Sequence, residues 1–310
     1  MIRIGSRGSQ LALWQANYVA AELRNLGAEV TIEIIRTAGD RMQELPAVPP
    51  ANPSGNGKGI FTREIEEALL QKRIDLAVHS LKDLPTELSP LLSLAAIPKR
   101  EDPRDVFVSQ RYGSLEELAP GAVIGTGSLR RQAQLLHIRP DLHCIEFRGN
   151  VDTRLNKLAQ GKADAIILAA AGLERLEKTE WIRQRFSPEI LCPAPGQGAL
   201  AIECRRDDAA LHRVLAPLED RASRLAVTAE RAFLAALGGG CEVPIGGYCR
   251  IVNPETQEFS LRGVVASADG KTILKAEVRH VDPMEAAAQL ARRLLSEGAA
   301  GVLGLRTAGV

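Results

Sequence analysis

The chain contains 310 residues, 45% of them hydrophobic and 25% charged, with a formal net charge of +1. This length predicts two or three compact domains, and the near-neutral charge gives no global reason to expect nucleic acid or an anionic membrane as a partner. No apolar run approaches the roughly 18–20 residues that a membrane-spanning helix needs, and no secretory signal is visible. Five cysteines without a C-x-x-C pair argue against a disulfide framework and a metal site. We therefore expect a cytoplasmic location, or a plastid one if a transit peptide has been removed.

Short β-type runs alternate with helical patterns over the first two-thirds of the chain. The runs "IRIG", "EVTIEIIRT" and "DLAVHS" predict strands, and helices are expected over 9–26, which Gly27 ends, and over 62–73. After residue 104 the alternation restarts, with strands at 105–109, 122–127, 142–147 and 163–171 and helices at 128–138 and 151–160. A capping box at Ser114–Glu117 predicts one more helix start. This alternation predicts α/β sheets covered by helices on both faces.

Two proline-rich segments, 97–105 and 191–199, bracket the second block, and the strand-like run "LAIEC" follows the later one. We infer that a second domain (104–192) is inserted into the first (1–98 with 199–217), and that the two crossing segments form a hinge. Ligands in such folds bind outside the carboxyl ends of the strands, in the crevice between the lobes. Residues 42–59 are rich in proline and glycine and predict a mobile loop, a candidate lid.

The last third, 220–310, predicts a small α+β domain. A helix over 220–237 would carry one apolar face, made of Ala222, Leu225, Ala229, Phe233 and Ala236. Three β-type runs follow at 246–252, 258–267 and 271–281, the last two joined by an Asp-Gly turn. A helix over 283–297 would close this antiparallel unit.

Several arginines lie at predicted strand-to-helix junctions. Arg7 and Arg148 follow strands, Arg154 lies in the next helix, and Arg130 and Arg131 fall in the first turn of a helix, where they oppose the helix dipole. An anion bound at that terminus would explain them. The alternative is that they are ordinary solvated arginines. As a set they indicate a site for carboxylate or phosphate.

Asp83 and Cys241 are the other two candidate functional residues. Asp83 lies just past the strand "DLAVHS", where α/β enzymes place catalytic groups, although a turn or cap role is the alternative; His79 is expected to be an ordinary strand residue. Cys241 lies in "LGGGCEVPIGGY", after a helix C-terminus and beside Glu242, where a low-pKa thiolate is disfavoured. A thiol that reacts once and then holds a group covalently fits this stretch, and a small residue packed in a loop is the alternative.

The sequence resembles the hydroxymethylbilane synthases, also called porphobilinogen deaminases, over nearly its whole length. The motifs that carry the resemblance are "IGSRGSQLALWQA", "GKGIFTREIE", "AVHSLKDLPTE", "REDPRDVFVS", "IGTGSLRRQAQL", "FRGNVDTRL", "DAIILAAAGLERL", "PGQGALAIECR" and "GGGCEVPIG". The resemblance implies two periplasmic-binding-protein-like lobes joined by a two-segment hinge, plus a C-terminal domain with a three-stranded antiparallel sheet. It also implies a transferase of porphyrin, heme or chlorophyll biosynthesis, which joins four porphobilinogen molecules head to tail with loss of ammonia. The reaction would take place on a dipyrromethane cofactor held by a thioether to Cys241.

The same resemblance assigns roles to individual residues. Asp83 would be the catalytic aspartate. Cofactor binding would fall to Cys241 and to Ser80, Lys82, Asp83, Thr126, Ser128, Arg130 and Arg131. Substrate side chains would be bound by Arg7, Ser9, Arg148, Arg154 and Arg175, and Lys58 and Phe61 are lid or stacking candidates. Gly127 stands where a second serine is frequent in the family, so no side-chain contact is carried over there.

Two other classes of function compete with this interpretation. A solute-binding protein would also have two hinged lobes and an arginine-lined crevice, but it would need neither the third domain nor Cys241. Nucleic-acid binding through the arginines is disfavoured by the near-neutral charge. We expect a monomer that binds porphobilinogen, without a metal, a nucleic acid or a membrane as partner.

Overall fold

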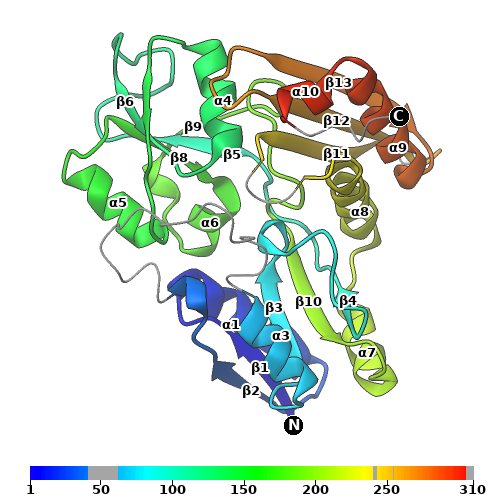
Figure 1. The fold of residues 1–310 in the computed structure, drawn as a ribbon. Coiled ribbons are helices and arrows are strands. Elements are labelled where there is room, and N and C mark those ends of the chain that lie inside the picture. Colours follow the sequence, from blue (N-terminus) through cyan, green and yellow to red (C-terminus); the bar gives the residue numbers. More distant parts are fainter. Residues whose placement is uncertain (41–61, 240–242, 254, 305–310) are drawn as a thin grey trace. The chain divides into compact units, whose positions relative to one another are not determined.

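The computed structural model describes residues 1–40, 62–239, 243–253 and 255–304. The chain divides into two compact units, Met1–Arg100 with Ala199–Arg221, and Glu101–Gly198 with Ala222–Val310. The described residues contain three sheets, and Figure 1 labels most of their strands. The boundaries of the three domains predicted from the sequence stay a prediction.

The first unit is built on one five-stranded sheet in the order β2-β1-β3-β10-β4. Its strands are β1 (Ile2–Ser6), β2 (Val30–Ile34), β3 (Leu76–Ser80), β4 (Leu92–Ala96) and β10 (Leu200–Arg205). β1 runs parallel to β2 and β3, and β10 runs antiparallel to β3 and β4. Helices α1 (Gln10–Asn25) and α7 (Ala209–Leu215) share a core with Leu76 and Val78, whereas α3 (Arg63–Leu70) packs with Ala77. Because successive strand residues point to opposite faces, the helices cover both faces of this sheet.

The second unit begins with a sheet of the same kind, in the order β7-β6-β8-β5-β9. Its strands are β5 (Asp105–Val108), β6 (Val123–Gly125), β7 (His143–Ile145), β8 (Ala165–Ala169) and β9 (Ile182–Arg185). Helix α4 (Leu129–Ile138) shares a core with Phe107 and Ile167, whereas α5 (Val151–Ala159) and α6 (Ala170–Arg175) pack with Val106 and Ile166. The alternation again places helices on both faces.

The two five-stranded sheets share one topology. In each, three neighbouring strands are parallel, and the fourth strand in the row runs antiparallel to both of its neighbours. That antiparallel strand is β5 in one sheet and β10 in the other, and each directly follows a segment that connects the two units. The predicted fold class, two periplasmic-binding-protein-like lobes with a two-segment connection, is confirmed.

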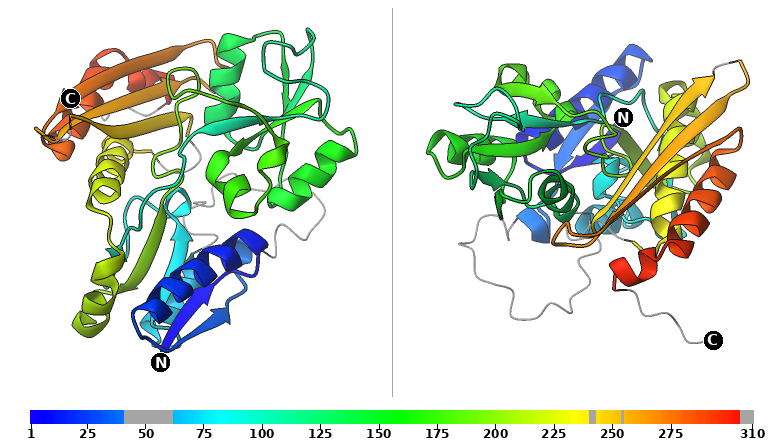
Figure 2. Two further views of the ribbon diagram at one scale, coloured as in Figure 1. Left: turned by 180° about the vertical axis from the view of Figure 1, so that it is seen from behind. Right: turned by 90° about the horizontal axis from the view of Figure 1, so that it is seen from above.

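A three-stranded antiparallel sheet follows in the second unit, as predicted. Strands β11 (Ile245–Asn253), β12 (Glu258–Ala266) and β13 (Ile273–His280) pair in chain order, and α8 (Arg221–Ala236) and α9 (Pro283–Ser296) share a core with them (Figure 2). A short helix, α10 (Ala299–Val302), adds Ala299 to this core. The predicted face of α8 is partly wrong: Ala229 and Phe233 are buried, but Ala222 and Ala236 are exposed. The buried stripe instead includes Ala226 and Leu234, so it is rotated around the helix axis.

Glycines let this third sheet contact helix α4 and the segment around Cys192 closely. A Cβ on Gly246 of β11 would lie 2.9 Å from Cys192 Cβ, and the Gly247 N–H donates to Pro193 O at 2.9 Å. At the β12–β13 turn, Gly270 has φ +71, and its carbonyl oxygen lies 3.1 Å from Nδ1 of His137 in α4. The third sheet is thus attached to the helix that carries Arg130 and Arg131.

Other predicted elements differ from the structure in particular ways. Residues Ser114–Glu117 form no helix; the Glu117 carboxylate accepts from the Gly113 N–H at 2.7 Å, whereas a capping box would need the Ser114 N–H. Strands β4 and β9 and helices α6 and α7 were not predicted. Gly27 follows the end of α1 at φ +84, as predicted, and Ser9 caps the start of this helix. None of the helices in the described ranges has the length and apolar character that a bilayer crossing requires.

The Phe233 ring packs against two glycines in the core of the third sheet. A Cβ on Gly263 would lie 2.6 Å from Phe233 Cζ, and a Cβ on its cross-strand partner Gly247 would lie 3.3 Å from the same ring. We expect Phe233→Ala to lower the free energy of unfolding of this unit by about 3–5 kcal/mol, because the cavity cannot be refilled by these glycines. Urea unfolding followed by circular dichroism measures the change. The exposed Val281→Ala is the control, expected within about 0.5 kcal/mol of the parent, and equal losses in both variants would contradict the prediction.

Candidate functional site

The first unit gathers one set of candidate residues at the carboxyl edge of its sheet. β1 and β3 are parallel neighbours, so the residues that follow them lie at the same edge. Arg7 directly follows β1, Ser80 ends β3, and Lys82 and Asp83 lie in a single 3-10 turn, Leu81–Asp83. The N–H of Leu81 donates to Ala199 O at 3.0 Å, which ties this turn to the start of β10. The structure thus brings together Arg7, Ser80 and Asp83 by topology.

Asp83 is exposed, and its carboxylate has no hydrogen-bond partner within the described ranges. The preceding strand is rigid: Leu76, Ala77 and Val78 are buried, and the His79 ring lies 3.1 Å from the buried Glu203 carboxylate of β10. His79 is therefore an interior strand residue. An exposed carboxylate on a rigid strand end can act on a ligand without first losing an internal partner.

Ser80, Ser9 and Arg7 are all held by neighbouring groups. Gln15 of α1 donates to Ser80 Oγ at 2.8 Å, and Ser9 Oγ accepts from the Ala12 N–H at 3.3 Å as the cap of α1. Arg7 Nε donates to Asp40 at 2.9 Å. Partial burial works to raise the pKa of Asp40, but hydrogen bonds from Arg7 and Thr37 hold it below its ordinary value. Arg7 therefore has an internal counter-ion in this structure.

The second unit repeats the arrangement at the edge formed by β6, β7 and β8. These three strands are parallel neighbours, so the residues that follow them share one edge. β5 is antiparallel to β8 and starts at this edge, with Asp105 opposite Ala169. The candidates at or near this edge are Thr126, Ser128, Arg130, Arg131, Arg148, Arg154 and Arg175.

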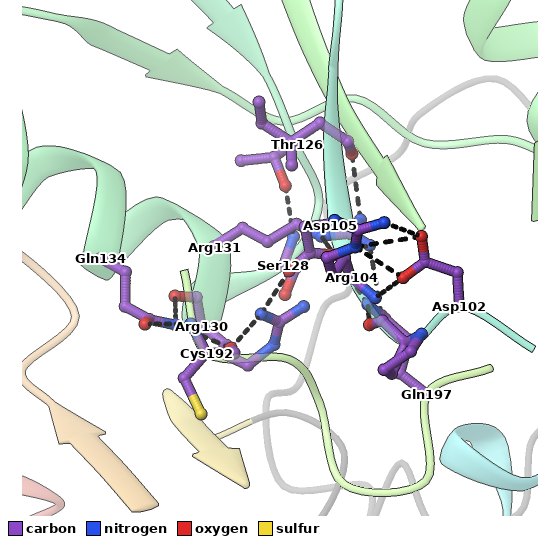
Figure 3. Close-up of polar contacts among 12 residues, drawn as sticks. Asp102, Arg104, Asp105, Thr126, Ser128, Arg130, Arg131, Gln134, Cys192 and Gln197 are labelled. Carbon is purple, nitrogen blue, oxygen red and sulfur yellow. Dashed lines mark hydrogen bonds and ion pairs between the residues drawn. The ribbon is translucent and has the colours of Figure 1, made fainter. Parts of the chain in front are cut away.

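Arg130 and Arg131 converge on the buried carboxylate of Asp105 (Figure 3). Arg130 Nη1 donates to Oδ2 at 2.7 Å and to the Cys192 carbonyl at 2.6 Å. Arg131 donates to Oδ1 from Nε at 2.9 Å and from Nη2 at 2.7 Å, and its Nη1 donates to Ile167 O at 3.0 Å. Asp105 is fully buried, and the arginines are 4% and 5% exposed. The alternative that Arg130 and Arg131 are ordinary solvated arginines is therefore wrong, and their binding of a ligand anion stays a prediction.

This cluster supplies the anion that the sequence pattern required. Arg130 and Arg131 lie in the first turn of α4, where the helix dipole opposes positive charge. The Asp105 carboxylate offsets this unfavourable interaction. Burial works to raise the pKa of Asp105, but the charges of Arg130 and Arg131 hold it far below its ordinary value. Gln197 Nε2 adds a hydrogen bond to Oδ1 at 2.9 Å and a second to Pro103 O at 2.7 Å.

The other candidates at this edge differ in exposure. Thr126 is buried, and its Oγ1 accepts from the Ser128 N–H at 3.2 Å, which shapes the turn before α4. Arg175 is buried and donates to Gly198 O at 2.7 Å. Arg148 is exposed beside Glu146, and Arg154 lies in α5. Arg148 is thus solvent-exposed with Glu146 as its ion-pair partner, and Arg175 is bound to the connecting segment.

Cys241, Lys58, Phe61 and the predicted loop 42–59 lie outside the described residues. Asp105 and Gln197 are functional candidates that the sequence reasoning did not single out. A signal for Asp105 was present, because an acidic residue opens the otherwise apolar strand "DVFV", and a charge buried in such a strand has to be paired. Gln197 lies in "PGQGA" and carries no such signal.

Two family models match the chain. One, described as "Porphobilinogen deaminase, dipyromethane cofactor binding domain", matches residues 2–213, and the other, "Porphobilinogen deaminase, C-terminal domain", matches residues 224–297. A porphobilinogen deaminase of Brevibacillus brevis is 48% identical over 97% of this chain and 96% of its own length. One of Syntrophotalea carbinolica is 47% identical over 97% and 95%. Among solved structures, a methionine-binding lipoprotein of Bacillus subtilis is 12% identical over 72% of this chain and 91% of its own, with a TM-score of 0.43.

The Asp105 cluster makes a testable prediction about stability. Asp105→Asn leaves two buried guanidinium groups without their carboxylate, and we expect a loss of about 3–5 kcal/mol in the free energy of unfolding at neutral pH. The native pKa of Asp105 is depressed, so the ionised carboxylate stabilises the fold fully above about pH 4 and progressively less below it. The difference between parent and variant should therefore shrink as the pH falls below about 4. Urea unfolding followed by Trp181 fluorescence in a Trp14→Phe background reports on this unit, and a difference independent of pH would contradict the role of the charge.

Proposed function

Because the chain belongs to the porphobilinogen deaminase family, we propose that it is a hydroxymethylbilane synthase with Asp83 as catalytic residue and Cys241 as the attachment residue of a dipyrromethane cofactor. It is an enzyme of tetrapyrrole biosynthesis, and its reaction joins four porphobilinogen molecules head to tail with loss of ammonia. The observation that best supports the site is the exposed Asp83 carboxylate at the same sheet edge as Arg7. We further propose that it acts as a monomeric cytoplasmic transferase.

The arginines of the second unit suit a ligand that carries several carboxylates. Porphobilinogen and the pyrroles built from it carry acetate and propionate side chains, and a planar guanidinium pairs well with a carboxylate. Arg130 Nε is buried and has no hydrogen-bond partner within the described ranges, so this guanidinium has donor capacity left. The donor set therefore fits the dipyrromethane.

Two sets of side chains would hold the pyrroles, one for the cofactor and one for the incoming substrate. When bound, the cofactor supplies the pyrrole α-carbon to which the first substrate is joined. Arg130 and Arg131, with Ser80, Lys82, Thr126 and Ser128, would bind its side chains and fix its orientation. Arg7, Ser9, Arg148, Arg154 and Arg175 would bind the carboxylates of incoming substrate. The position of each pyrrole would thus be set mainly by charge.

The chemistry needs a fixed negative charge near the reacting ring. When the amino group leaves porphobilinogen as ammonia, the C–N bond breaks and the substrate becomes a cation stabilised by its pyrrole nitrogen. The Asp83 carboxylate would accept a hydrogen bond from that N–H and stabilise the positive charge. It would also assist the transfer of a proton to the leaving amino group and the removal of the α-proton after the new C–C bond forms.

Replacement of Asp83 tests the catalytic role. We expect Asp83→Asn to keep the fold, because the side chain is exposed, and to lower kcat by at least about 100-fold, because the amide carries no negative charge. Steady-state turnover of porphobilinogen measures the effect. Glu87→Gln, another exposed carboxylate four residues further on, is the control and should keep parental turnover. Near-parental turnover of Asp83→Asn would refute the assignment.

The covalent attachment has a direct readout in the intact mass. We expect the purified protein to exceed its sequence mass by two linked pyrrole units, and Cys241→Ser to lose this excess because no thioether can form. Cys144→Ser, at a half-buried cysteine of β7, is the control and should keep the excess. A solute-binding protein would show no excess in any variant.

A further inference from the structure

We propose that Asp105 is a positioning residue for the dipyrromethane, which holds Arg130 and Arg131 in the orientation that receives its carboxylates. This inference rests on the proposed function, in which those two arginines bind the cofactor. Asp105 itself would not touch the cofactor, because its side chain is fully buried and its two carboxylate oxygens are bonded to the two arginines.

The geometry around Asp105 fixes both arginines separately. Each carboxylate oxygen takes one arginine: Oδ2 accepts from Arg130, and Oδ1 accepts twice from Arg131. Each guanidinium is held at a second point by a backbone carbonyl, of Cys192 for Arg130 and of Ile167 for Arg131. A guanidinium held at two points loses little further conformational entropy when a ligand binds, because the side chain is already ordered in the folded protein.

The charges favour a further anion at the same place. Asp105 contributes one negative charge, and Arg130 and Arg131 contribute one positive charge each, so the Asp105 carboxylate alone does not neutralise both guanidinium groups. Like charges in a buried site repel each other. A ligand carboxylate would reduce this repulsion, whereas a fully neutralised cluster would not attract one.

The connecting segments also depend on Asp105. Gln197 donates to the Asp105 carboxylate and to the carbonyl of Pro103. Gln197 and Pro103 lie on different connecting segments. The Cys192 carbonyl that holds Arg130 also accepts from Gln134 of α4 at 3.1 Å. Asp105 is therefore the point at which both arginines and the segment around residue 197 meet.

Two substitutions separate charge from position. Asp105→Asn keeps the shape and removes the charge, and its amide N–H groups cannot accept from either arginine. Asp105→Glu keeps the charge but moves the carboxylate by one methylene group. We expect both to weaken cofactor loading, since either change releases at least one guanidinium from its orientation.

The control has to lose stability without touching the arginines. Phe107 lies two residues further along the same strand and is fully buried, but it has no polar contact with the cluster. Phe107→Ala is expected to destabilise the fold about as much as Asp105→Asn. A role of Asp105 in stability alone would affect loading equally in both variants.

The experiment follows the loading of full-length protein made in cells that cannot synthesise porphobilinogen. Porphobilinogen is added at increasing concentration, and the gain of two pyrrole units is measured by intact mass on folded, monodisperse protein. We expect Asp105→Glu and Asp105→Asn to need at least about tenfold more porphobilinogen for half-maximal loading, and Phe107→Ala to load like the parent.

Each outcome decides the matter. Parental loading of Asp105→Glu or Asp105→Asn, or an equal defect in Phe107→Ala, would overturn the positioning role; if Asp105→Asn does not fold, Asp105→Glu decides alone. Failure of the proposed function is distinguishable, because then the parent itself would gain no pyrrole units.

Discussion

The stability of the second unit depends on the ion pairs that a buried carboxylate, Asp105 at the start of β5, makes with two arginines. An ionised carboxylate in a protein interior is unfavourable unless it is paired, and Asp105 is paired with two arginines and one glutamine. These partners come from α4 and from the segment before β10. One ion cluster therefore connects strand β5, the helix that carries Arg130 and Arg131, and the segment that leads to β10.

The strand order explains why the candidate residues lie at one edge of each sheet. Parallel neighbours end at the same edge, so residues that are far apart in sequence, such as Arg7 and Asp83, follow adjacent strands. The antiparallel strands β5 and β10 begin at that edge. The first residues of β5 and of β10 thus lie at the edge of their own sheet where that sheet's candidate residues lie.

The fold and the location of the candidates could be predicted from the sequence because both depend on local patterns. Alternating strands and helices follow from hydrophobic periodicity, and candidate residues after strands follow from the topology. The pairing of Asp105 could not be predicted, because its partners lie 25, 26 and 92 residues away. The helix expected at Ser114 was wrong: the Glu117 carboxylate accepts from the Gly113 N–H instead of the Ser114 N–H, and Leu115 and Leu118 reach the core from turn conformations.

Hairpin turns are usually where a protein tolerates insertions. The β12–β13 turn is an exception, since a Cβ on Gly270 would lie 2.5 Å from Ala133 O and 3.1 Å from His137 N of α4. This turn packs directly against α4, the helix that carries Arg130 and Arg131. Peptide tags, loop exchanges and new chain termini therefore belong elsewhere on this molecule, and the length of this turn is fixed by a helix more than 130 residues away.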